Sequence, residues 1–220
     1  MPYVKMTNIA IMVGGPEKCL PDIKNRSNES LIWIGVDRGA LRLLDYGIKP
    51  VLALGDFDSI TPAELNKLKN EVEDVRQFPA EKDATDTELA VRVAFHEYFP
   101  EEVTIFGATG GRLDHFLNNL WLVFLPTFQP YISKIRIVDN KNSLSYFIPG
   151  TYTIEKERDK KYLAFICLTS VEKLTLTGVK YELTETDIAF PCSLASNEFA
   201  NEKAQFSFES GLVAVIQSKD

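Results

Sequence analysis

The chain has 220 residues, of which 45% are hydrophobic and 25% are charged, a composition typical of a globular protein with one large domain or two small ones. Its net charge of -7 and the lack of a Lys/Arg cluster in the sequence argue against nucleic-acid binding. The longest apolar stretch, residues 120–128, is too short to span a bilayer.

The cysteines indicate a reducing compartment. Cys19, Cys167 and Cys192 fit no metal-ligand spacing, and their odd number argues against a disulfide framework. The N-terminus also lacks the basic region and long apolar run of a signal peptide. We therefore expect a soluble, cytoplasmic protein.

The first half of the chain alternates short apolar runs with helical patterns. Four runs that end at glycine or aspartate predict strands at residues 8–13, 31–36, 51–54 and 103–106. Capping patterns and helical spacing predict helices that begin after Thr61, over residues 86–99 and over residues 113–124. Apolar strands separated by helices are typical of a parallel sheet that is covered on both faces.

Beyond Pro126 the pattern changes to short β-branched and aromatic segments separated by glycine turns. They predict strands at residues 135–138, 143–148, 151–154, 163–168, 174–176, 204–208 and 212–216. Short strands at this spacing suggest an antiparallel sandwich or barrel. We expect an α/β domain over residues 1–130 and a β domain over residues 131–220.

An acidic loop follows the strand predicted at residues 51–54. If its backbone is extended, Asp56 and Asp58 project to the same side and together can hold magnesium. The alternative is a solvated turn that caps the next helix, although Thr61 already serves that purpose.

A second acidic group surrounds the helix predicted to begin at Asp86. Acidic residues at a helix N-terminus are favoured by the helix dipole alone, which accounts for one of Asp83 and Asp86. The functional alternative makes Asp86 a metal ligand and Lys82 a phosphate partner.

A glycine-rich segment, residues 107–111, precedes Arg112, Asp114 and His115. Its glycines permit close backbone approach, and the amides at the start of the following helix suit a phosphate, to which Arg112 can add a bidentate contact. The spacing matches neither a Walker A loop nor the dinucleotide-binding fingerprint. The alternative is a surface turn in which Arg112 pairs with Asp114 and His115 is structural.

These groups lie where strands of the predicted sheet end. Ligands of open parallel sheets bind at the carboxyl ends of the strands, so the acidic residues and Arg112 are expected around one edge. Together they predict metal-assisted phosphoryl chemistry.

The segments 55–59, 83–86 and 107–118 resemble, in order and approximate spacing, those of thiamine pyrophosphokinases. Upstream, residues 14–16, 37–40 and 47–50 are also similar to that family, as are residues 178–183 and 193–198 downstream. The resemblance covers nearly the whole chain. Tyr181 stands where some members carry Trp, and Leu89 where some carry Lys.

The resemblance implies a Rossmann-like α/β domain followed by an antiparallel β-sandwich. It implies transfer of pyrophosphate from ATP, the co-substrate, to the thiamine hydroxyl with release of AMP, and magnesium as the cofactor. It also implies a homodimer in which each active site lies between the α/β domain of one subunit and the sandwich of the other.

Site residues are expected accordingly. The expected metal ligands are Asp56, Asp58 and Asp86, and these three with Arg112 and Asp114 form the expected catalytic set. ATP is expected to bind Gly14, Gly15, Asp37, Gly39, Lys82, Asp83, Thr85, Thr109, Gly110, Arg112 and His115. Thiamine is expected to bind Tyr181, which can stack on its cationic ring, together with Ser193, Ser196 and Asn197.

Two other functions fit parts of the pattern. A metal-dependent phosphohydrolase can also place Asp-x-Asp after an apolar strand, although there the motif normally follows the first strand. A non-catalytic thiamine diphosphate sensor would bind without consuming ATP, but such a sensor has no need of a magnesium cluster.

Overall fold

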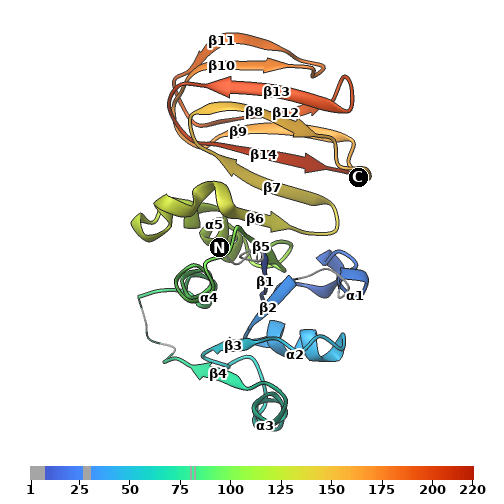
Figure 1. Ribbon diagram of the computed structural model, residues 1–220, viewed down its shortest axis with the longest axis vertical. Coiled ribbons are helices and arrows are strands. Elements are labelled where there is room, and N and C mark those ends of the chain that lie inside the picture. Colours follow the sequence, from blue (N-terminus) through green and yellow to red (C-terminus); the bar gives the residue numbers. More distant parts are fainter. Residues whose placement is uncertain (1–7, 27–30, 80, 82) are drawn as a thin grey trace, which may run out of the picture. The chain divides into compact units, whose positions relative to one another are not determined.

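The computed structural model describes residues 8–26, 31–79, 81 and 83–220. The chain forms two compact units, whose elements are labelled in Figure 1. Unit 1 extends to Tyr131 and includes Ile137–Asn140, whereas unit 2 consists of Ile132–Arg136 and Lys141–Asp220. Strand β6, Ile135–Val138, crosses from one unit to the other.

Unit 1 is built on parallel strands in the order β5–β1–β2–β3–β4. Their bounds are Asn8–Met12 for β1, Leu31–Val36 for β2, Leu52–Gly55 for β3, Asp74–Gln77 for β4 and Glu102–Phe106 for β5. The chain runs outward from β1 to β4 and then returns to the other side of β1. In open sheets, such a reversal of strand order is where ligands bind.

The helices of unit 1 follow the strand ends. They are α1 (Ile23–Arg26), α2 (Arg38–Asp45), α3 (Pro62–Glu71), α4 (Asp86–Val93) and α5 (Leu113–Trp121). A π-helical turn, Ala94–Tyr98, continues α4, and 3-10 turns lie at Glu17–Cys19, Leu122–Phe124 and Pro126–Lys134. The predicted cap of α3 is confirmed, because Thr61 and Glu64 form a reciprocal capping box.

Apolar packing fixes the start of α2 and the acidic loop. Buried Phe57 lies in one cluster with Ala40, Ala53, Leu68 and Val72, so the loop after β3 is anchored between α2 and α3. Leu43, which also lies on α2, belongs to a second cluster that includes residues of β1, β2 and β5. Burial of such side chains contributes about 1.5–3 kcal/mol each, which holds the loops at the strand ends in place.

Unit 2 is a pair of antiparallel sheets. One has the order β12–β9–β14–β7, with bounds Cys192–Glu198, Tyr162–Cys167, Val213–Ser218 and Asn142–Phe147. The other has the order β11–β10–β13–β8, with bounds Leu183–Ile188, Val171–Thr177, Lys203–Phe208 and Gly150–Glu155. Both sheets contribute to one core, exemplified by Phe165 on β9 and Phe206 on β13.

The predicted fold class is confirmed: a parallel α/β region is followed by antiparallel sheets that form a sandwich and not a barrel. Strands β4, β11 and β12 and helices α1 and α2 were not predicted. Within the described residues, none of the helices combines the length and the apolar character needed to cross a membrane.

Candidate active site

A cavity of about 870 Å³ opens in unit 1. Its walls come from the segments that follow β1, β2, β3 and β5, from the approach to α4, and from the first two turns of α5. The cavity thus lies at the carboxyl ends of the strands, next to the β1–β5 pair where the strand order reverses.

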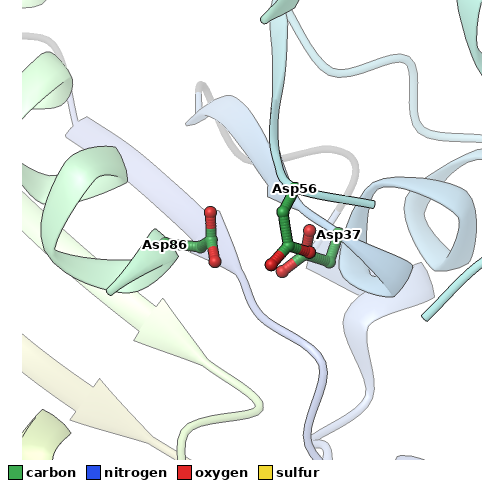
Figure 2. Close-up of side chains that lie close together, drawn as sticks. All are labelled: Asp37, Asp56 and Asp86. Carbon is green, nitrogen blue, oxygen red and sulfur yellow. The ribbon is translucent and has the colours of Figure 1, made fainter. Parts of the chain in front are cut away.

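Three carboxylates converge at this edge of the sheet. Asp37 precedes α2, Asp56 follows β3, and Asp86 is the first residue of α4. One carboxylate oxygen from each lies within 4.8 Å of the others, and Figure 2 shows the three side chains turned toward one another. All three are partly buried, so their mutual repulsion is weakly screened and favours a bound cation. The trio could hold a metal ion, since hard cations select carboxylate oxygens.

The position of Asp37 depends on an unusual backbone. Its φ of 47° lies in a region that non-glycine residues rarely adopt, at a cost of about 1–3 kcal/mol. The Asp37 N–H donates to the Leu54 carbonyl (3.0 Å), and its Oδ1 accepts the Phe57 N–H (3.1 Å). The Asp37 carboxylate is therefore held against the end of β3.

Gly55 leaves the space that this carboxylate occupies. A Cβ at position 55 would lie 1.8 Å from Asp37 Oδ1, which is far inside van der Waals contact. Its φ of 152° is also one that side chains rarely adopt. Glycine at this position is thus required by the neighbouring carboxylate.

Asp58 does not join the three-carboxylate cluster. The expected extended loop is absent, because Phe57 has a φ of 59° and is buried, and Asp56 Oδ1 accepts the Asp58 N–H at 3.0 Å. This turn leaves Asp58 exposed on the cavity wall. Its role as a metal ligand stays a prediction.

The start of α4 is fixed by polar contacts. Thr85 caps the helix by accepting the Glu88 N–H at 3.3 Å, which places Asp86 at the first helical position. Asn118 of α5 donates to Thr85 Oγ1 and to the buried Glu88, both at 3.2 Å. Exposed Asp83 lines the same cavity, and Lys82 lies outside the described residues.

The glycine turns of β1 and β5 touch each other. The Gly15 N–H donates to the Gly107 carbonyl at 3.0 Å, and a Cβ on Gly15 would meet that oxygen at 2.0 Å. Gly14, Gly15 and Thr109 line the cavity, but Gly39 and Gly110 are not among its lining residues. The Thr109 hydroxyl donates to buried Asp139 at 2.6 Å, so it is already engaged within unit 1.

Arg112 and Asp114 form the surface pair that the sequence allowed as an alternative. The Arg112 guanidinium donates twice to the Asp114 carboxylate, and Arg112 and His115 line the cavity. Hydrogen bonds from Arg112 lower the pKa of Asp114 from its usual 3.8 to about 2. Because both side chains are well exposed, this pair contributes little to stability.

We expect Arg112→Gln to raise the pKa of Asp114 toward 3.8, as measured by NMR titration of the carboxyl. The folded-state pKa of Asp114 is depressed, so the pair's contribution is present above pH ~4 and is lost as the pH falls toward 2. Lys67→Gln, which removes a cation that pairs with Asp45, is the control and should leave the Asp114 titration unchanged. A pKa that stays near 2 in Arg112→Gln would contradict this assignment.

Two arginines of the cavity wall are not among the predicted site residues. The Arg42 guanidinium donates to the Gly15 carbonyl at 2.8 Å, and Arg38 donates to the Ser59 carbonyl beside the acidic loop. Both belong to α2 and line the cavity. Their four-residue spacing at the start of a helix was the available signal, but α2 itself was not predicted.

The predicted thiamine-side residues lie in unit 2. Buried Asn197 accepts the Tyr181 N–H at 3.0 Å and donates to the Tyr181 carbonyl at 2.9 Å, so its amide fixes the Tyr181 backbone. The Tyr181 ring is exposed, with Lys180 Nζ 5.4 Å from its centroid. Ser193 and Ser196 are exposed on β12, and Ser196 has a φ of 61° at an irregularity of the strand.

Comparisons with known proteins converge on one family. The family model described as "Thiamin pyrophosphokinase, catalytic domain" matches residues 23–137, and "Thiamin pyrophosphokinase, vitamin B1 binding domain" matches residues 151–213. The thiamine pyrophosphokinase of Bacillus subtilis (strain 168) is 42% identical over 217 residues, which covers 98% of this chain and 100% of the relative.

Solved structures agree with this result. A thiamin pyrophosphokinase family protein from Enterococcus faecalis has a TM-score of 0.91 and 47% identity, covering 97% of this chain and 99% of its own. The crystal structure of the Bacillus subtilis thiamine pyrophosphokinase has a TM-score of 0.87 and 40% identity, covering 97% of this chain and 100% of its own.

Proposed function

Since the chain belongs to the thiamine pyrophosphokinase family, we infer that it is an ATP:thiamine diphosphotransferase, which transfers pyrophosphate from Mg-ATP to thiamine and releases AMP. The observation that carries this proposal is the convergence of Asp37, Asp56 and Asp86 beside a cavity at the strand ends. Such a cavity with a carboxylate trio suits a nucleotide whose phosphates arrive with a divalent cation.

We assign ATP to unit 1. The glycine turns at Gly15 and Gly107 bring backbone close to the cavity, and Arg38, Arg42 and Arg112 supply positive charge around it. Backbone amides at the start of α5 add phosphate donors. Asp83, Thr85, Thr109 and His115 line the same wall, consistent with the predicted ATP contacts.

The acidic trio fits a metal site because its ligand atoms are hard oxygens within reach of one another. Asp37, Asp56 and Asp86 would hold magnesium, with Asp58 as a further predicted ligand from the cavity wall. When bound, magnesium supplies positive charge that offsets the charge of the ATP phosphates.

The transfer itself needs an acceptor for one proton. The thiamine hydroxyl oxygen bonds to the β-phosphorus while the bond from that phosphorus to the AMP oxygen breaks. A carboxylate oxygen of Asp86 accepts the hydroxyl proton, and Arg112 stabilises charge that develops on the phosphoryl oxygens. Positioning and electrostatics account for most of such catalysis.

We assign thiamine to unit 2, so that residues 1–130 form the domain that binds ATP and magnesium and residues 131–220 form the domain that binds thiamine. The exposed Tyr181 ring can stack on the cationic thiazolium, and Asn197 holds the backbone of that residue in place. Ser193 and Ser196 offer hydroxyl groups on the exposed surface of β12.

A homodimer is part of the proposal. Leu113, Leu117 and Trp121 repeat every four residues on α5 and are all exposed, which forms an apolar stripe that a second copy can cover. Sedimentation equilibrium should give twice the 24.8 kDa chain mass, and a monomer would contradict the dimer.

We also propose that the protein is cytoplasmic, as its cysteine pattern predicts.

The reaction is tested with purified protein, ATP, magnesium and thiamine, followed by chromatography of the products. We expect thiamine diphosphate and AMP in equal amounts, and loss of both when EDTA is added. Inorganic phosphate with a covalent aspartyl-phosphate and without thiamine diphosphate would indicate a phosphohydrolase. Thiamine diphosphate binding with no ATP consumption would indicate a sensor.

A further inference from the structure

Two of the three cysteines face each other in unit 2. Cys167 is the last residue of β9, Cys192 is the first residue of β12, and the two are directly paired in the antiparallel register. They are separated in the sequence by the β10–β11 hairpin, so only the pairing of β9 with β12 brings them together.

The register satisfies the geometry of a disulfide. Directly opposed residues on antiparallel strands have Cα atoms about 4.5–5.5 Å apart and project to the same face of the sheet. A disulfide needs a Cα separation of about 4.4–6.8 Å, so the strands need not move apart or shift in register. The pair also lies at the end of the β9–β12 ladder, where the backbone can adjust to the S–S bond.

The two thiols differ in ways that set an order of reaction. Cys192 is exposed, whereas Cys167 is 1% exposed and belongs to the core of the sandwich. Burial, and to a lesser extent the adjacent Cys192 thiol, raises the pKa of Cys167 to about 12. Cys192 is therefore the thiol that an oxidant in solution meets first.

We propose that Cys167 and Cys192 are a reversible redox pair that a hydroperoxide converts into a cross-strand disulfide. The Cys192 sulfur attacks the peroxide, which yields a sulfenic acid and one water. The Cys167 sulfur then displaces that hydroxyl group, which forms the S–S bond and releases a second water. Two thiols thus lose two protons and two electrons, and hydrogen peroxide is reduced to two waters.

The disulfide would fasten an edge strand. Among the described strands, β12 lies at the edge of its sheet and pairs with β9, and Ser193 follows Cys192 directly. In a reducing compartment the pair rests as thiols, so the bond is a response to peroxide and not a permanent structural link.

Peptide mapping tests this proposal on the full chain. The protein is treated with hydrogen peroxide and is then unfolded in the presence of an alkylating agent, which blocks the free thiols. It is digested with trypsin and analysed by mass spectrometry without reduction. The three cysteines fall in separate tryptic peptides, residues 19–24, 162–173 and 181–203. We expect peptides 162–173 and 181–203 to be linked, peptide 19–24 to be alkylated, and dithiothreitol to reverse the link.

Variants separate this chemistry from unspecific oxidation. Cys19→Ser should give the same cross-link yield, and Cys192→Ser should leave Cys167 fully alkylated as a thiol. In Cys167→Ser, Cys192 should be trapped by dimedone as a sulfenic acid and then proceed to sulfinic acid. The proposal fails if wild-type Cys192 is over-oxidised while Cys167 stays a thiol, or if either cysteine links to Cys19 instead.

Discussion

Replacing Asp86 by Asn should lower kcat/KM for thiamine by on the order of 10³-fold, because the substitution removes one negative charge from the carboxylate trio at nearly constant shape. It also removes the group that we propose as acceptor of the hydroxyl proton. The cap of α4 should persist, since it is made by Thr85 and not by Asp86. The loss is therefore expected with a nearly unchanged unfolding midpoint.

A direct metal readout separates the two proposed roles of Asp86. Titration with Mn²⁺, followed by EPR, should show weaker binding in Asp86→Asn and in Asp56→Asn. Asp45→Asn is the matched control: Asp45 lies outside the cavity in a surface ion pair with Lys67, so activity and Mn²⁺ affinity should be unchanged. Near-normal turnover of Asp86→Asn would remove this residue from the proposed mechanism.

The acidic loop shows how far residue spacing can predict a site. The alternation of side chains in an extended chain predicted that Asp56 and Asp58 converge. The structure instead brings Asp37 to Asp56, because Phe57 turns back into the core in a left-handed conformation. Sequence spacing cannot reveal such a turn, since aromatic residues seldom adopt positive φ. Asp37 had been expected at the site, but as an ATP contact.

The missed strands have a common cause. Strands β4, β11 and β12 each lie at the edge of a sheet, and each carries polar residues along most of its length. Apolar runs predicted β1, β2, β3 and β5 because a central strand is buried on both faces. An edge strand has solvent on one side and carries little of that signal. The Cys167–Cys192 pairing was missed for the same reason, since it lies on β12.

Replacing Gly55 by Ala should lower kcat/KM by about 10²-fold with only a modest loss of stability. The Cβ atom of the new alanine would lie 1.8 Å from the present position of Asp37 Oδ1. The Asp37 side chain would move away, because it can move more easily than the backbone of β3. The carboxylate then leaves the trio, and displacement of a catalytic group by about 1 Å can cost 10²-fold in rate. The unfolding free energy should fall by about 1–2 kcal/mol from backbone strain.

The Gly47→Ala variant distinguishes the effect of backbone strain from the effect of displacing the Asp37 carboxylate. Gly47 also has a positive φ (76°), but a Cβ there would meet no atom within 4 Å. Both variants should lose stability in urea titrations by similar amounts, since both place alanine in a conformation that favours glycine. Only Gly55→Ala should lose Mn²⁺ affinity and turnover. If the two variants were equally active, Asp37 would not need its present position, and the metal site would depend on Asp56 and Asp86 without it.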